Sequence, residues 1–131
     1  MAPRVIVVFS GTVSIDFTSK PVVLASDDIL GTVDALRARG IEFQDTPDTY
    51  YEGVEARVPN HQESLAELKR RRILIDGGAD TGILLQIFTK NAIGPIFFEV
   101  IQRKGNQGFG EGNFQALFES IELDQKRRGV I

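Results

Sequence analysis

The last third of the sequence restricts the fold most, because three apolar runs follow one another there with short turns between them. The runs are Ile73–Asp76, Ile83–Thr89 and Ile96–Gln102. Segments 77–80 and 91–95, which contain glycine or proline, separate them. Such runs with turn residues between them are typical of strands in an antiparallel meander. A glycine-rich loop at 105–112 follows, and the helical spacing of apolar residues after it predicts a helix over residues 113–128 that Asn113 caps.

The segment before the meander predicts a strand that leads into a helix. Val22-Val23-Leu24 is a short apolar run. The residues Ser26-Asp27-Asp28 that follow are typical N-cap residues, and they put carboxylates at the positive end of a helix. Apolar residues recur at helical spacing from Ile29 to Leu36, and Gly40 is typical of a helix end. Ile41-Glu42-Phe43 predicts another short strand.

Two short helices are predicted in the middle of the chain. The first begins near Pro47 and has an apolar face of Tyr50, Tyr51, Val54 and Val58. The second covers Glu63–Arg71, and the basic run that ends it complements the helix dipole. His61 lies between them and is expected in an exposed loop without a role.

The N-terminus predicts a hairpin. Arg4–Ser10 is rich in Val and Ile, and Val13–Thr18 alternates apolar with polar residues, which is the period of a half-buried strand. The apolar run in the first of these segments is shorter than the roughly 7–15 residues of a secretory signal. Nowhere does the sequence reach the about 20 apolar residues that a membrane helix needs.

Composition limits the possible functions. A chain of 131 residues is long enough for one domain with a core, and its net charge of −3 argues against a binder of nucleic acid or anionic membranes. Without cysteine there is neither a disulfide nor a thiolate metal site, which fits a reducing cytoplasm. The single histidine means that one copy of the chain cannot supply a mechanism that needs two.

Two polar residues interrupt the apolar strands. Glu99 alternates with Phe97 and Ile101, so the three side chains share a face and the carboxylate is expected to be at least partly buried. A buried carboxylate needs a partner, a hydrogen bond or a metal ion, and the alternative is an edge strand with Glu99 in water. Gln86 is the second such residue, and together they indicate a polar site on one face of the meander.

The glycine loop has two interpretations. It lies between a strand and a helix, where a dinucleotide-binding fingerprint would lie. That fingerprint needs a second parallel strand with an acidic residue about 20 positions on, and none follows here. The other interpretation is a hinge that lets the last helix fold over a sheet.

Four segments closely resemble the 4-hydroxyphenylpyruvate dioxygenases, especially the C-terminal part of the bacterial enzymes. They are Asp45–Glu52, Leu84–Phe88, Phe97–Arg103 and Gly108–Phe114, in the same order and at the same spacing. The resemblance runs from about Leu24 to the end. It implies the vicinal-oxygen-chelate superfamily, and therefore an α+β fold with one βαβββ module whose antiparallel sheet is curved. We expect this module at 21–131, preceded by the non-matching hairpin at 1–20.

The resemblance also implies a chemistry. The family converts 4-hydroxyphenylpyruvate and O₂ to homogentisate and CO₂ in tyrosine breakdown, with Fe(II) held by two histidines and one carboxylate. By motif, the carboxylate is Glu99 and a polar catalytic residue of the pocket is Gln86. The remaining assignments are a catalytic Asn113 and substrate contacts by Phe88, Phe97, Phe109 and Phe114, with Phe109, Asn113 and Phe114 at the end of the last helix that closes over substrate.

The sequence departs from the family where the iron ligands are expected. Lys20-Pro21 stands in place of a Gln-His pair whose histidine binds iron, and no counterpart of the second histidine lies upstream. We therefore expect a truncated module that is inactive alone, binds iron weakly or not at all, and pairs as a cytoplasmic homodimer. The alternatives are a remnant that binds an aromatic acid or a protein partner, or an enzyme similar to hydroxymandelate synthase.

Overall fold

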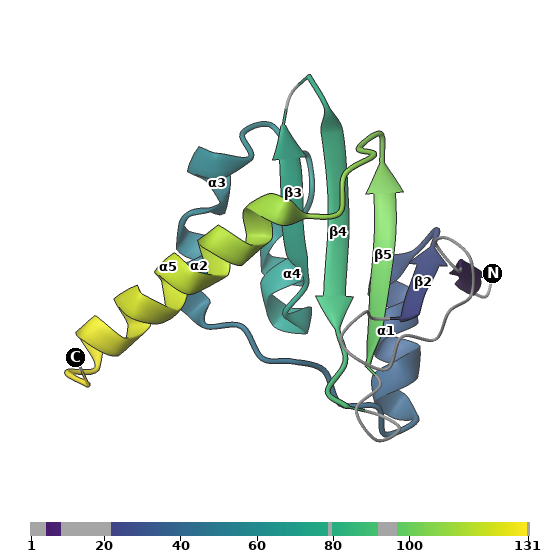
Figure 1. The fold of residues 1–131 in the computed structure, drawn as a ribbon, viewed down its shortest axis with the longest axis horizontal. Helices are drawn as coiled ribbons and strands as arrows, with labels where there is room; N and C mark the ends of the chain where they lie inside the picture. Colours follow the sequence, from purple (N-terminus) through teal and green to yellow (C-terminus); the bar gives the residue numbers. More distant parts are fainter. Residues whose placement is uncertain (1–4, 9–21, 79, 92–96, 131) are drawn as a thin grey trace. The chain divides into compact units, whose positions relative to one another are not determined.

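The computed structural model describes residues 5–8, 22–78, 80–91 and 97–130 (Figure 1). The chain divides into two compact units. The first comprises Met1–Gln44 and Gln86–Gln102, and the second comprises Asp45–Leu85 and Arg103–Ile131. Two strands, β4 (Gly82–Phe88) and β5 (Phe98–Lys104), have residues in both units.

The first unit is a sheet with one helix. It contains β1 (Val5–Val8), β2 (Val22–Ser26), α1 (Ile29–Ala38), the end of β4 and most of β5. Its strand order is β1-β2-β5-β4. β1 pairs antiparallel with β2, Val5 lying opposite Ser26, whereas β2 pairs parallel with β5, Val22 lying opposite Phe98. The sheet is thus mixed at this edge, because the long connection from β2 to β5 allows a parallel pairing that a hairpin does not.

The start of α1 confirms the predicted capping. Asp28 is the N-cap, and its carboxylate accepts the Gly31 N–H at 3.1 Å. Gln102 of β5 holds the same turn, because its Oε1 accepts the Ile29 N–H at 2.9 Å and its Nε2 donates to the Asp27 carbonyl at 2.8 Å. Ile29 and Val33 are fully buried. The Gln102 side chain therefore accepts a backbone N–H of the first turn of α1, a group that has no partner within the helix.

The second unit is built mainly from helices around a two-stranded segment. It contains α2 (Asp48–Glu52), α3 (Val54–Arg57), α4 (Leu65–Arg71), β3 (Leu74–Gly78) beside the start of β4, and α5 (Glu111–Arg127). The predicted apolar residues Tyr50, Tyr51, Val54 and Val58 are all buried, but Gly53 divides the single predicted helix into α2 and α3, and Val58 is the C-cap of α3. Within this unit α5 runs beside α2 (Figure 1).

Two tyrosines of α2 bind the backbone of β3 and of the residue just before it. Tyr51 donates its hydroxyl to the Ile73 carbonyl at 3.0 Å. The Tyr50 hydroxyl oxygen accepts the Ile75 N–H at 2.9 Å and lies 3.0 Å from the Ile75 carbonyl oxygen. The phenols therefore satisfy backbone groups that a neighbouring strand would otherwise take, which protects β3 from pairing with another chain.

Three details differ from the sequence-based expectations. Phe43 makes an isolated bridge with Thr89, and no strand forms at 41–43, because Phe43 alone has a strand partner there. Gly110, at φ 76°, is the N-cap of α5, so Asn113 lies inside the helix and caps nothing. β1 pairs with β2, whereas the predicted strand Val13–Thr18 and the pair Lys20-Pro21 lie outside the described residues.

Among the residues that the structure describes, no helix is both long enough and apolar enough to cross a membrane.

Candidate functional site

Gln86 and Glu99 form a buried polar pair between β4 and β5. Gln86 is 1% exposed and Glu99 is 6% exposed. The Gln86 Nε2 donates to Glu99 Oε1 at 2.8 Å. Because β5 lies between β2 and β4, Glu99 is not on an edge strand, and the interpretation that placed it in water is wrong.

Both side chains are shut away from water. Their low exposure shows this directly, and Ile101, two residues from Glu99 and so on its face of the strand, is 2% exposed. In such surroundings a hydrogen bond to a carboxylate is stronger than in water, and its loss is costly. The amide therefore orients Glu99 Oε1 at a defined place on the sheet.

Two aromatic rings lie beside this pair along the same strands. Phe88 is two residues from Gln86, and Phe97 is two residues from Glu99, so alternation puts all four side chains on one face. The Phe88 and Phe97 rings meet edge to face, with centroids 6.4 Å apart. Thr89 holds this end of the two strands, since its N–H donates to the Phe98 carbonyl and its Oγ1 accepts the Phe98 N–H, both at 2.8 Å. The face thus offers an aromatic wall next to an amide and a carboxyl group.

The other three residues that the resemblance selected belong to the second unit. Asn113 is 2% exposed, and its Oδ1 accepts the Tyr50 hydroxyl at 2.6 Å. Phe109 and Phe114 are 56% and 66% exposed. The Arg103 guanidinium lies 5.2 Å from the centroid of the Phe109 ring. Of the predicted site residues, Gln86 therefore bonds to Glu99, and Phe88 packs against Phe97. Asn113 bonds to Tyr50 of α2 within the second unit.

An ion pair that sequence patterns did not reveal completes the attachment of α5. Arg57 Nη1 lies 3.3 Å from Asp76 Oδ1, and its Nη2 donates to the Tyr50 hydroxyl and the Ile75 carbonyl, each at 2.8 Å. Asp76 Oδ2 accepts the Gly112 N–H in the first turn of α5 at 2.9 Å. Burial, the main cause, raises the pKa of the Tyr50 hydroxyl. No periodicity marks Arg57, because its helix is only four residues long.

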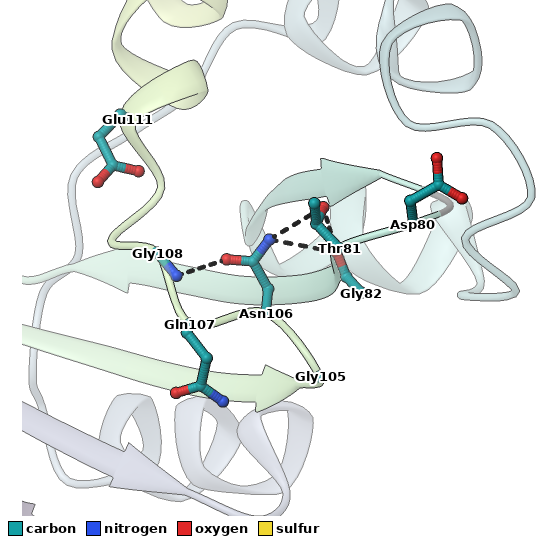
Figure 2. Close-up of a pocket in the computed structure, with 8 residues that line it drawn as sticks. All are labelled: Asp80, Thr81, Gly82, Gly105, Asn106, Gln107, Gly108 and Glu111. Carbon is teal, nitrogen blue, oxygen red and sulfur yellow. Dashed lines mark hydrogen bonds between the residues drawn. The ribbon is translucent and has the colours of Figure 1, made fainter.

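The glycine loop borders an open pocket in the second unit (Figure 2). Asn106 organises it: its Oδ1 accepts the Gly108 N–H at 2.7 Å and its Nδ2 donates to the Gly82 carbonyl at 3.2 Å. Asp80 and Glu111 add two carboxylates to the lining. These negative charges disfavour phosphate, and Asp76 already takes the Gly112 N–H at the helix start. The loop is therefore a poor nucleotide site.

His61 is buried, so its expected position at the surface is wrong. It is 8% exposed, with Nε2 at 2.9 Å from Glu55 Oε1 and Nδ1 accepting the Glu63 N–H at 2.9 Å. The residues on both sides, Asn60 and Gln62, have φ of 58° and 61°, and this left-handed backbone turns the ring inward. Loop polarity in the sequence gave no sign of this turn.

The residues present do not fit a facial-triad iron site. Such a site needs two histidines and one carboxylate. Both ring nitrogens of His61, the single histidine, are already engaged within the second unit. In the described part of the chain no cluster of three or more His, Cys, Asp or Glu side chains is arranged to hold a metal ion.

Comparison with known proteins places the sequence close to the dioxygenases. No protein-family model matches the chain. It is 65% identical over 111 residues to a 4-hydroxyphenylpyruvate dioxygenase of Pseudomonas aeruginosa, and 61% identical over 112 residues to one of Legionella pneumophila. It is also 62% identical over 111 residues to the Hemolysin VllY of Vibrio vulnificus. Each match covers 84% of this chain but only 31–32% of the relative, so the chain spans about a third of their length.

Solved structures show the same likeness. A mutant of 4-hydroxymandelate synthase from Streptomyces coelicolor matches 79% of this chain and 30% of its own, with a TM-score of 0.60 and 36% identity. A fusion of a xylose isomerase-like TIM barrel with a 4-hydroxyphenylpyruvate dioxygenase matches 76% of this chain and 16% of its own, with a TM-score of 0.65 and 31% identity. The resemblance to the dioxygenases and the α+β fold class are thereby confirmed.

Proposed function

We propose that this chain is a dioxygenase-type module that binds an aromatic 2-oxo acid and does not build an iron centre by itself. The observation that carries the proposal is the buried Gln86–Glu99 pair with Phe88 and Phe97 on the same face. These residues fall within the region similar to the dioxygenases, because a match over 84% of 131 residues leaves too few residues at either end to exclude them.

The proposed roles follow from the chemistry of each side chain. Phe88 and Phe97 pack against the substrate ring, since aromatic pairs prefer this edge-to-face or offset geometry. The Gln86 amide, which Glu99 orients, provides a polar group for the oxo-acid end. Phe109, Asn113 and Phe114 are the proposed closing group by resemblance, and Asn113 serves it indirectly by fixing the first turns of α5 on Tyr50.

Iron is the part of the family chemistry that this chain alone does not support. Glu99 is one carboxylate, His61 is engaged with Glu55 and Glu63, and Lys20-Pro21 stands where the family has a ligand histidine. A proline has no side-chain donor for a metal. We therefore propose that homogentisate formation needs residues beyond this chain. A cytoplasmic location is part of the same proposal and fits the absence of cysteine.

Calorimetric titration of the purified chain with 4-hydroxyphenylpyruvate, with and without Fe(II) under anaerobic conditions, tests the proposal. We expect binding without metal, no more than trace bound iron, and no homogentisate after oxygen is admitted. Pyruvate, which has the oxo acid but no ring, is the control and should bind at least about 10-fold more weakly, since burying a ring adds more than 1.4 kcal/mol. Stoichiometric bound iron together with homogentisate would contradict the claim that the chain alone builds no iron centre. Failure of 4-hydroxyphenylpyruvate to bind would contradict the proposed site for an aromatic 2-oxo acid.

The similarity to 4-hydroxymandelate synthase supports a second candidate. In that case the chain would share the aromatic substrate, and an active assembly would release 4-hydroxymandelate rather than homogentisate. Chromatography of the products, after this chain is combined with a dioxygenase-type partner that carries the missing histidines, separates the two. The higher identity to the dioxygenases, 65% against 36%, favours homogentisate.

A further inference from the structure

Thr89 joins the end of β4 to the start of β5 through its side chain. The two strands are neighbours and run antiparallel (Figure 1). The Thr89 N–H donates to the Phe98 carbonyl at 2.8 Å, as in a regular antiparallel pair. A regular pair would return a bond from the Phe98 N–H to the Thr89 carbonyl, but here the Thr89 hydroxyl accepts it at 2.8 Å. The spacing of the strands at this point therefore depends on one side chain.

Residues Phe43 and Gln44 bind the other edge of the same short stretch. Phe43 forms an isolated bridge with Thr89, and the Gln44 N–H donates to the Phe88 carbonyl at 2.8 Å. Phe43 is 7% exposed, so this contact is shut away from water. Phe88 and Thr89 are thus held from both sides, and all these residues belong to the first unit.

Thr89 does not itself lie on the face that carries the aromatic rings. Side chains alternate along an extended chain, so Gln86 and Phe88 share one face and Thr89 belongs to the other. Thr89 is 2% exposed. It can therefore act on a ligand only through the residues that it places, which are Phe88 before it and Phe97 before its partner Phe98.

We propose that Thr89 is a positioning residue that fixes the Phe88 and Phe97 rings against each other and thereby makes this face selective for an aromatic acid. Each ring belongs to the residue directly before one member of the Thr89–Phe98 pair, so a shift between the strands here moves one ring past the other. The edge-to-face contact, with centroids 6.4 Å apart, depends on this placement. The selectivity rests on the proposed function, because that function assigns both rings to the ring of the substrate.

The hydroxyl group can be removed without changing the shape of the side chain. Thr89→Val deletes the acceptor of the Phe98 N–H and keeps the branched outline. A backbone N–H without an acceptor is unfavourable, so the strands should shift until another oxygen takes this bond. Thr89→Ser keeps the acceptor and should therefore keep the spacing of the strands.

Calorimetric titration of the full chain with 4-hydroxyphenylpyruvate and with pyruvate tests the selectivity through the ratio of the two dissociation constants. Thr89→Val should lower the preference for the aromatic acid by about 2- to 10-fold, the factor that a well-placed aromatic contact contributes, and should change the affinity for pyruvate by less than about twofold. Thr89→Ser should keep the wild-type preference. A preference that Thr89→Val leaves unchanged would overturn the proposal.

Thr32→Val is the matched control for a general weakening of the first unit. Thr32 is 1% exposed, and its hydroxyl lies 2.7 Å from the Ser26 hydroxyl, so this variant also loses a buried side-chain hydrogen bond of the same unit. Thr32 belongs to α1 rather than to the two strands, and its replacement should leave the preference for the aromatic acid unchanged. An equal loss of preference in Thr32→Val and Thr89→Val would overturn the positioning role.

Contacts between the rings, measured by NMR, distinguish a failure of the positioning role from a failure of the proposed function. The nuclear Overhauser effect between the Phe88 and Phe97 ring protons should be present in the wild type and in Thr89→Ser, and it should be lost in Thr89→Val. If the wild type binds no aromatic acid, the proposed function and the selectivity fail together, and the ring contact still decides whether Thr89 places the rings. A ring contact that persists in Thr89→Val would overturn that role.

Amide exchange in the unmodified chain decides the matter if Thr89→Val does not fold. Phe98 is the first residue of β5, where fraying would leave its amide unprotected. The bond to the Thr89 hydroxyl predicts that this amide exchanges at least about 10-fold more slowly than a free amide. Exchange at the rate of a free amide would overturn the proposal.

Discussion

Glu99 needs its hydrogen bonds because a carboxylate shut away from water costs free energy unless polar groups surround it. Replacing Gln86 with Leu removes the amide that donates to Glu99 Oε1. We expect Gln86→Leu to lower the free energy of unfolding by about 1–3 kcal/mol, the usual cost of depriving a buried polar group of its partner. Urea denaturation followed by circular dichroism measures the change.

The double variant is the control for this prediction. If the cost comes from the deprived carboxylate, then Gln86→Leu combined with Glu99→Leu should cost less than the sum of the two single changes, by about 0.5–3 kcal/mol. A strictly additive result would mean that the two side chains stabilise the sheet independently. It would contradict the interpretation of Gln86 and Glu99 as one coupled polar site.

Tyr50 predicts a dependence on alkaline pH. Burial, the largest cause, raises the pKa of its hydroxyl above the ordinary value of 10.0. A pKa that folding raises contributes stability that is fully present below pH 10 and is lost as pH rises through the folded value. Ionised Tyr50 can no longer donate its single hydrogen to Asn113 Oδ1, and its charged oxygen lies 3.0 Å from the Ile75 carbonyl oxygen.

We therefore expect the midpoint of thermal unfolding to fall above pH 10 in the wild type and to fall less steeply in Tyr50→Phe. At pH 7 the same variant should be less stable by about 1–3 kcal/mol, because it loses the bonds to Ile75 and Asn113. Thermal melts at half-unit steps of pH follow both effects. Parallel pH profiles of the two proteins would exclude Tyr50 as the group concerned.

At the scale of elements, Gly82 is a glycine of β4 whose replacement should be costly. It has φ +69°, and a Cβ atom there would lie 2.7 Å from the Gly105 carbonyl carbon and 2.8 Å from its Cα. Gly82→Ala therefore combines a left-handed backbone with a clash against rigid backbone, and we expect a loss of about 2–5 kcal/mol. Gly40 is the matched control: it has φ +88° with nothing within 4 Å.

Gly40→Ala should cost only the conformational part, about 1–2 kcal/mol. The difference between the two variants in chemical denaturation thus isolates the close approach of Gly82 to the glycine loop. Equal losses at both positions would mean that the loop moves away from β4 without cost, as a hinge would.

Helix α5 shows why periodicity predicts an element better than its direction. The spacing of Phe114, Phe118 and Ile121 correctly predicts a helix there. The face of α5 that packs against the rest of its unit carries Asn113 and Ser120 instead. Hydrogen bonds hold this face: Tyr50 bonds to Asn113 and Thr49 bonds to the Ser120 carbonyl. Asp76 binds the first turn of the helix. Those partners are 36 to 71 residues away in the sequence, and no local pattern contains them.

At the scale of the whole molecule, the sequence predicts features that depend on residues close together in the chain. It misses features that depend on contacts between residues far apart in the chain. The capped start of α1 and the strands of the last third rest on neighbouring residues, and they are confirmed. The burial of Glu99 follows from alternation and is confirmed as well. The inward turn of His61 depends on left-handed backbone at Asn60 and Gln62, and the Arg57–Asp76 pair joins separate elements, so neither could be predicted.

The boundary between residues 1–20 and 21–131 remains a prediction that amide hydrogen exchange can test. β1 covers one side of β2, with Val8 opposite Val23, and β5 covers the other side. Removing residues 1–20 should leave β2 as an edge strand. The amides of β2 that face β1 should then exchange with solvent at rates typical of an exposed strand, because fraying edges open at little cost.

In that shortened chain the amides of β5 and of α1 should keep at least most of their protection, because their partners lie at 22–44 and 86–102. A global loss of protection would contradict the boundary, since it would mean that β1 is part of the cooperative core. Val23→Thr in the full chain is the control for β2: it removes apolar surface without removing the pairing with β1. Its β2 amides should stay protected, which separates the loss of an edge partner from a general weakening of the strand.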